Sequence, residues 1–293
     1  MKTILVALLV LATPAVGAQK QKKLQNKTPV LKAESWLQLY NLDDRNPTQF
    51  NLPRRLSEAS GLAFSPDGRL FCHNDELGIV FQVNYTDGSI VKQFSLGRIA
   101  VRADFEGIAI AGEWFYLASS NGNIYEFKEG KNSGRVSYEV YKTPLNPNND
   151  VEGLEYDGES RCLLLACKGD PGKGHKGYKA VYAFSLADKK LIEKPRLLIP
   201  LSVVVKKGHG GEFNSSGIAK HPKSGTYFVI SANGGSIIEI TEEGDVLAQK
   251  DIPQKVNEQP EGIAFAPDLS IIICNDMKGG VGKMTVYPLL GKK

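Results

Sequence analysis

Apolar residues occur along this chain in short runs separated by polar turns, and the order of these runs repeats. Each unit begins with a polar or acidic pair, a glycine and an apolar triplet. A repeat of four short strands with a period of about 40–50 residues is typical of β-propeller blades. The segments that begin the units are Glu58–Phe64, Asp104–Ile110, Asp150–Tyr156, Asn214–Lys220 and Gln259–Phe265.

The runs inside each unit predict four strands. A turn such as Ser65–Gly68 follows the apolar triplet, and its Pro, Asp and Gly favour a tight β-turn. A second apolar run then ends at Asn or Asp, as in Leu70–Asp75. An alternating run such as Ile237–Ile240 and a final amphipathic run complete the unit. The pattern therefore predicts an all-β protein, a β-propeller of four-stranded blades.

The last unit is shorter than the others, because the chain nearly ends after Met284–Tyr287. The run Trp36–Tyr40 can supply its missing outer strand, so we expect an N-terminal strand to close the ring and remove an exposed sheet edge. We count five blades. The long stretch from Gly153 to Gly211 has room for part of a sixth, and both numbers stay open here.

The first residues predict export. Lys2 precedes the apolar run Ile4–Ala12, and the small side chains of Val16 and Ala18 suit the −3 and −1 positions of a signal-peptide cleavage site. The run is shorter than the roughly 20 apolar residues that a bilayer requires. We expect a signal peptide over residues 1–18, a flexible leader over 19–34 and the propeller over 35–293. The protein is then periplasmic or secreted, with no membrane span.

Composition and charge limit the classes of partner that we expect for this protein. The chain has 30 Gly and only 3 Met, which favours strands and turns over helices. Its net charge of +4 comes largely from the leader and the C-terminal tail, so we expect no nucleic-acid partner, and we expect a monomer. Cys162 and Cys167 fall on opposite faces of one expected strand, whereas Cys72 and Cys274 lie in apolar runs. We expect free, buried thiols, because a domain of this size needs no disulfides.

Acidic side chains recur just before the repeated glycine. In a propeller the loop before strand one and the loop after strand two open on the same face, so polar residues in both loops gather at one axial mouth. Crowded carboxylates repel each other unless a cation joins them. Carboxylates and amides suit Ca²⁺, which takes about six to eight oxygen ligands, better than zinc. The candidate calcium ligands are Glu106, Glu152, Glu261, Glu58, Asn233 and Asn275.

Two structural alternatives apply to these acids: they cap turns, or they form a solvated rim that holds no metal.

The third unit departs from the repeat in a long loop after its second strand, Gly169–Lys179. Its cations reach the same face as the acids, and so does a Lys- and His-containing segment before the fourth unit. Positive charge beside a bound metal suits a small anionic ligand, such as a phosphate ester or a carboxylate. A solvated, Gly-rich surface loop is the alternative. The candidate ligand-binding residues are Lys173, His175, Lys176 and His209.

Standard catalytic motifs are absent from the sequence: it has no G-x-S-x-G elbow, no Walker loop, no H-E-x-x-H and no EF-hand loop. His73, His175 and His209 are expected on the acidic face, but nothing in the sequence pairs one of them with a nucleophile. The catalytic residues, if any, are unassigned.

Several motifs in a fixed order also carry a family likeness. They are Leu56–Gly61, Asp104–Ala109, Asp150–Leu154, Leu165–Asp170 and Gln259–Ala264. Together they resemble the SdiA-regulated family of bacterial envelope β-propellers, over nearly the whole chain from about residue 36 to 287. The Glu-Gly-Ile-Ala motif is also similar to that of esterase-like phytases and other calcium propellers.

The resemblance implies a periplasmic or secreted propeller that binds calcium on its axis. Glu106, Glu152 and Glu261 match the recurring acidic positions of the family, whereas Ser60 and Ser216 replace the acid in two units. Two functions follow. The first is a calcium-binding module that binds or senses a partner in the envelope. The alternative is a calcium-dependent hydrolase of a phosphate ester or lactone, in which the metal polarises the scissile group.

Overall fold

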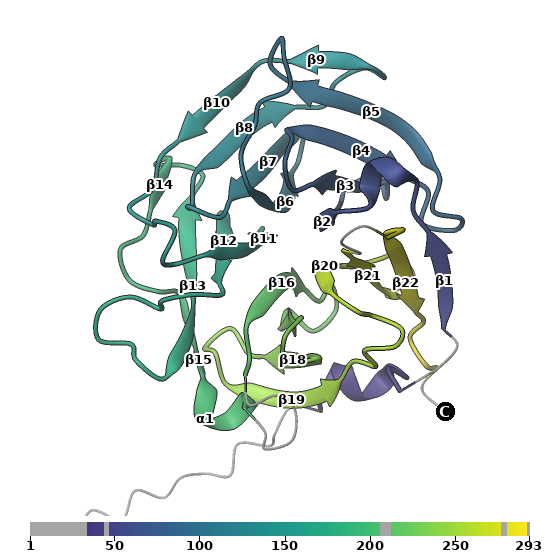
Figure 1. Cartoon of the computed structure of the whole chain (residues 1–293). Helices are drawn as coiled ribbons and strands as arrows, with labels where there is room; N and C mark the ends of the chain where they lie inside the picture. The colour runs from purple at the N-terminus through teal and green to yellow at the C-terminus, as the bar shows by residue number, and fades with distance from the viewer. Residues whose placement is uncertain (1–33, 44–46, 206–211, 277–279, 292–293) are drawn as a thin grey trace, which may run out of the picture. The chain divides into compact units, whose positions relative to one another are not determined.

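Five sheets, each of four or five strands, surround a common axis in the computed structural model (Figure 1). The structure describes residues 34–43, 47–205, 212–276 and 280–291. The expected signal peptide, nearly all of the expected leader, and His209 lie outside these residues. The predicted all-β propeller is confirmed, and its blade number is five.

In the first four blades the strands follow the chain from the axis outward, and blade 5 differs in its outermost strand. Blade 1 contains β2 (Ala59–Phe64), β3 (Leu70–Asn74), β4 (Ile79–Val83) and β5 (Ile90–Leu96), with β9 (Gly134–Val136) added in parallel at its edge. Blade 2 contains β6 (Phe105–Ala111), β7 (Trp114–Ser119), β8 (Ile124–Lys128) and β10 (Tyr138–Tyr141). Blade 3 contains β11 (Val151–Asp157), β12 (Cys162–Cys167), β13 (Tyr178–Ser185) and a split outer strand, β14 (Lys190–Leu191) and β15 (Leu197–Pro200).

The remaining two blades have four strands each. Blade 4 contains β16 (Ser215–Lys220), β17 (Tyr227–Ser231), β18 (Ser236–Ile240) and β19 (Val246–Asp251). Blade 5 contains β20 (Pro260–Phe265), β21 (Ile271–Asn275), β22 (Lys283–Tyr287) and, outermost, β1 (Thr48–Asn51). Short helical turns are η1 (Trp36–Leu39), η2 (Arg54–Leu56) and α1 (Leu201–Val204).

Burial explains the sequence pattern of the strands. Every residue of β12 and β21 is buried, because the second strand of a blade is covered on both faces by its neighbours. These strands are therefore continuous apolar runs, as buried strands usually are. No residue of the outermost strand β19 is fully buried, which accounts for its amphipathic composition.

The expectation that Trp36–Tyr40 forms the outer strand of the last blade is wrong. These residues form η1, and the outer strand is β1, which pairs with β22 in antiparallel register. Trp36 packs on His221 with ring centroids 4.6 Å apart. The buried Leu37 donates its backbone N–H to the carboxylate of Glu239 at 2.9 Å. Contacts with His221 and Glu239, which lie far along the chain, thus hold this run in a helical turn rather than a strand.

The long stretch after Gly153 contains no sixth blade in its described part. It supplies the eight-residue strand β13, the split outer strand, the loop between β12 and β13, and α1. Among the described residues, no helix is both long and apolar enough to cross a membrane. All four cysteines are buried, and none is in a disulfide in this structure.

Candidate functional site

All five innermost strands carry the same irregularity near their start. In each one the pairing with the second strand shifts at the residue before the repeated glycine. A bulge of this kind leaves one residue unpaired and changes the direction of its side chain. The bulged residues are Ser60, Glu106, Glu152, Ser216 and Glu261. All of them except Ser216 line one small cavity on the axis, which we call the axial cavity.

The axial cavity is narrow because the repeated glycines let the innermost strands approach each other closely. A Cβ atom on Gly107 would lie 2.7 Å from the backbone N of Leu154, and one on Gly217 would lie 2.9 Å from the carbonyl O of Glu261. None of the five repeated glycines has a positive φ, so close approach is their structural role. The cavity has a volume of about 10 Å³, roughly the space for one water or one ion.

The three axial carboxyl groups resist ionisation in the absence of a cation. Burial, and then the charge of Glu152, raise the pKa of Glu106 to about 9. Burial and the charge of Glu152 likewise raise the pKa of Glu261 to about 8. The hydrogen bonds to these two groups come from neutral side chains: Ser60 Oγ donates to Glu106 Oε2 at 2.8 Å, and Gln259 Nε2 donates to Glu261 Oε1 at 2.8 Å.

Glu152 differs from the other two, because a cation contacts it. The Nζ atom of Lys168 lies 2.7 Å from Glu152 Oε1 and 4.0 Å from Asp150 Oδ2. Burial still raises the pKa of Glu152. Lys168 directly follows β12, and this position at the end of a second strand is the signal that could have placed it at the mouth. We assigned it no role from the sequence.

The other three predicted calcium ligands do not line the axial cavity. Asn233 is exposed. Asn275 is buried and donates from Nδ2 to Asn257 Oδ1 at 3.0 Å. Glu58 is partly exposed, and its charge helps burial to raise the pKa of Asp75. In the described ranges, no three His, Cys, Asp or Glu side chains are grouped closely enough to hold a metal ion.

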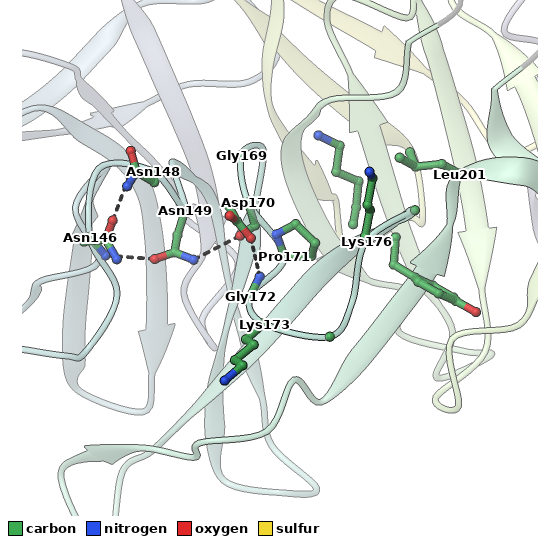
Figure 2. A pocket seen from close by; sticks show the side chains of 14 residues that line it. Asn146, Asn148, Asn149, Gly169, Asp170, Pro171, Gly172, Lys173, Lys176 and Leu201 are labelled. Carbon is green, nitrogen blue, oxygen red and sulfur yellow. Dashed lines mark hydrogen bonds between the residues drawn. The ribbon is translucent and has the colours of Figure 1, made fainter.

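A second, larger cavity of about 670 Å³ lies at the long loop of blade 3, and we call it the loop cavity (Figure 2). In Figure 2, Asp170 and Pro171 lie in the middle of the lining. The side chains on one side of them are Asn146, Asn148 and Asn149, and those on the other side are Lys176 and Leu201. Its lining includes three lysines and three asparagines, together with Asp170. These are Lys173, Lys176, Lys179, Asn146, Asn148 and Asn149.

Hydrogen bonds fix one wall of the loop cavity. Asn149 Nδ2 donates to the carbonyl of Asp170 at 3.0 Å, and Asp170 Oδ1 accepts the backbone N–H of Gly172 at 2.7 Å. Lys173 and Lys176 are exposed and line the cavity as predicted ligand-binding residues. His175 is partly buried and does not line it.

The two cavities are linked through Lys168. The loop after β12 continues to pair with the segment that enters β11, because the backbone N–H of Lys168 donates to Asp150 O at 2.7 Å. The ammonium group of Lys179, which lines the loop cavity, donates to the carbonyl of Lys168. The Lys168 side chain in turn contacts Glu152 of the axial cavity. The acidic and the basic groups thus open on the same face.

His73 is not accessible as a general base. It is fully buried, its Nδ1 lies 2.9 Å from the carbonyl O of Asn74, and burial lowers its pKa to about 4. His221 is also buried, and its ring nitrogens hydrogen-bond the hydroxyl groups of Tyr40 and Ser224. Burial lowers the pKa of His221 to about 4. Both side chains are neutral at neutral pH.

Comparisons with known proteins support the fold. No protein-family model matches the chain, and no curated protein matches it by sequence. A luciferin-regenerating enzyme is similar in structure, with 13% identity and a TM-score of 0.53, covering 84% of this chain and 96% of that one. The glutaminyl cyclase of Myxococcus xanthus is similar with 15% identity and a TM-score of 0.51, covering 82% and 93%. At these identities the likeness shows a β-propeller fold and no particular chemistry.

Proposed function

We propose that this propeller is a calcium-binding module, and that its loop cavity takes a small anionic ligand. The observation that carries the proposal is the pair Glu106 and Glu261. Both carboxyl groups line one ion-sized cavity, where Glu261 is buried and Glu106 is partly buried. Within the described residues, the side chains that donate hydrogen bonds to them, Ser60 and Gln259, are neutral. The resemblance to the SdiA-regulated family adds the expectation that the module works in a bacterial envelope.

A hard cation suits these groups chemically. Without a cation, Glu106 and Glu261 avoid the cost of buried charge by holding protons, since their pKa values are about 9 and 8. Ca²⁺ accepts carboxylates in irregular arrangements, whereas Mg²⁺ demands a near-ideal octahedron. Glu106, Glu152 and Glu261 would hold the ion. Their oxygens are not grouped as a metal site in the described residues, so binding must draw them together and release protons.

The competing explanation is that protons and Lys168 alone stabilise the axial carboxyls. Lys168 pairs with Glu152, and its charge also acts to lower the pKa of Glu261, yet that pKa stays raised to about 8. The two explanations differ in what calcium does, so a titration separates them.

The experiment is calorimetric titration and thermal unfolding of chelator-treated protein in CaCl₂, in MgCl₂ and in chelator. Calcium at 100 times its dissociation constant should add about 2.7 kcal/mol to the free energy of unfolding, and magnesium should add little. Glu106→Gln and Glu261→Gln should each weaken calcium binding. Unfolding curves that superimpose in calcium and chelator would refute the proposal.

Glu155→Gln is the matched control. Glu155 lies past the repeated glycine on β11 and lines a separate cavity at the opposite end of the innermost strands. Burial raises its pKa to about 8, so it resembles the axial glutamates in burial and charge. Its substitution should leave calcium binding unchanged.

The alternative function is a calcium-dependent hydrolase of a phosphate ester or lactone. The specific observation in its favour is that the loop cavity opens on the same face as the axial carboxylates, with Lys173 and Lys176 suited to an anionic group. Asp170 is the carboxylate in the cavity that is available to orient water. Hydrolysis of generic phosphate esters or lactones that requires calcium, and that Asp170→Asn reduces, would favour the hydrolase over the binding module.

A further inference from the structure

Two cysteines face each other where the first blade meets the last. Cys72 belongs to β3 of blade 1 and Cys274 to β21 of blade 5. Their exposed fractions are 1% and 0%, and both belong to one apolar cluster formed by these two blades. The cluster also contains Leu62 and Ala59 of blade 1 and Met284 of blade 5. The thiols are therefore brought together by the ring and not by the local sequence.

The Cys274 thiol makes contacts across the blade junction, whereas the Cys72 thiol donates to the carbonyl O of His73 in its own strand. Cys274 Sγ donates to the carbonyl O of Ala59 in blade 1 at 3.5 Å. A Cβ atom on Gly262, the strand partner of Cys274, would lie 2.6 Å from Cys274 Sγ and 3.0 Å from Gly61 Cα. Two facing glycines thus leave the space that the sulfur occupies. The Cys72 thiol lies close enough to Cys274 to contribute to the raised pKa of the Cys274 thiol.

We propose that Cys72 and Cys274 form a disulfide that joins the first and last blades covalently. The oxidant is a small disulfide such as oxidised glutathione, or an oxidoreductase that carries one. One cysteine thiolate attacks the oxidant's S–S bond and releases one thiol. The second thiolate attacks the mixed disulfide and releases the other thiol. Two electrons and two protons pass from the cysteines to the oxidant, and one S–S bond is formed for one broken.

The position of this bond gives it a structural purpose. Blade 5 is completed by β1, which comes from the start of the described chain, so the junction of the last blade with the first relies on strand pairing and apolar contact. A disulfide between residues 72 and 274 would prevent the two blades from separating. A link between distant residues constrains the unfolded chain most strongly, in the chain-entropy account.

The disulfide between Cys72 and Cys274 forms most easily during folding, before both thiols are buried. Burial, and then the neighbouring Cys72 thiol, raise the pKa of Cys274 well above its usual range, so the attacking thiolate is scarce in the folded protein. We therefore expect oxidation during folding, as the junction assembles and while the oxidant still reaches both sulfurs.

The test is refolding of the denatured, reduced full chain in a mixture of reduced and oxidised glutathione. Unpaired thiols are then blocked in denaturant, and the protein is digested without reductant for mass spectrometry. We expect the peptides that contain Cys72 and Cys274 to be linked, with the loss of two hydrogens. The oxidised protein should unfold several degrees above the same chain refolded in reductant.

The other two cysteines supply the control. Cys162 and Cys167 are buried on opposite faces of β12, in different apolar clusters, and cannot pair with each other there. Cys162→Ser/Cys167→Ser should keep both the link and the gain in unfolding temperature, whereas Cys274→Ser should lose both. The proposal fails if all four thiols are blocked after oxidative refolding. It also fails if Cys72 is linked to Cys162 or Cys167.

Discussion

The ammonium group of Lys168 lies 2.7 Å from the carboxylate of Glu152, at the edge of a cavity that Glu106 and Glu261 also line. One lysine side chain thus lies beside a cavity lined by three acids, of which Glu152 and Glu261 are buried and Glu106 is partly buried. The side chain of Glu152 is 7% exposed and that of Lys168 is 36% exposed, so the pair is only partly screened by water.

Replacing Lys168 with Met should destabilise the calcium-free protein. Glu152 would lose its cationic partner, and a lost hydrogen bond between charged groups costs about 1–3 kcal/mol. The same change should enlarge the stabilisation that calcium provides, since the ion no longer competes with Lys168. Urea denaturation in chelator and in calcium measures both effects. Lys128→Met is the control, because Lys128 pairs with Glu113 at 3.0 Å on the exposed surface, where such pairs contribute about 0–1 kcal/mol.

In chelator, the stability of the protein should fall as the pH rises from about 6.5 to about 9; below that range His73 and His221, whose pKa values burial lowers to about 4, act in the opposite direction. Glu106 and Glu261 have pKa values of about 9 and 8 in the folded protein, above the ordinary value of 4.5. Between these limits the folded state therefore holds protons that the unfolded state releases. Each such group lowers the free energy of unfolding by at most about 1.4 kcal/mol per pH unit.

Glu155, with a pKa of about 8, also lowers the stability as the pH rises. The pH dependence is therefore measured in the Glu155→Gln background, so that the contribution of Glu106 and Glu261 can be seen separately from that of Glu155. In that background, Glu106→Gln/Glu261→Gln should flatten the curve of unfolding free energy against pH. Saturating calcium should flatten it in the parent as well. An equal slope in all of these proteins would show that the axial carboxyls ionise normally.

The repeated glycines should not tolerate a methyl group. In Gly107→Ala the new Cβ would lie 2.7 Å from the backbone N of Leu154, and backbone in the next blade cannot easily move away. Overpacking of this kind costs about 1–3 kcal/mol. At Gly158 a Cβ would meet only Tyr156 Cε1 at 3.7 Å, so Gly158→Ala should change stability by less than about 0.5 kcal/mol. Chemical denaturation of the two variants compares them directly.

The loop cavity should bind anions through its exposed lysines. Lys173→Gln/Lys176→Gln should reduce the affinity for phosphate or citrate, and the parent's affinity should fall with added salt. Lys190→Gln/Lys194→Gln removes the same charge from exposed positions of blade 3 that do not line the cavity. Calorimetric titration of the three proteins gives the comparison. If both double variants bind as the parent does, the lysines of the loop only face solvent.

The blade pattern could be predicted from the sequence because it is local. Apolar periodicity, turn residues and the repeated glycine act over a few neighbouring residues, and they recur in every unit. The position of Glu106, Glu152 and Glu261 on one axis follows from the same repeat, since equivalent positions of a propeller face a common centre. Lys173 and Lys176 were found because their loop breaks the repeat.

Other features depend on partners far away in the sequence. Trp36–Leu39 reads as a strand by composition, but Glu239 and His221 hold it in a helical turn. Asn275 ends a second strand, as the predicted ligands do, yet Asn257 binds it inside the protein.

The sequence by itself thus determined the all-β repeat and the residues that the innermost strands present to the axis, because backbone propensity and hydrophobic periodicity are properties of neighbouring residues. Only the tertiary structure decided that Lys168 pairs with Glu152, that β1 rather than Trp36–Tyr40 completes blade 5, and that Cys72 meets Cys274. These contacts join residues from different strands or blades. They form only when the ring brings their side chains together, and no local pattern encodes them.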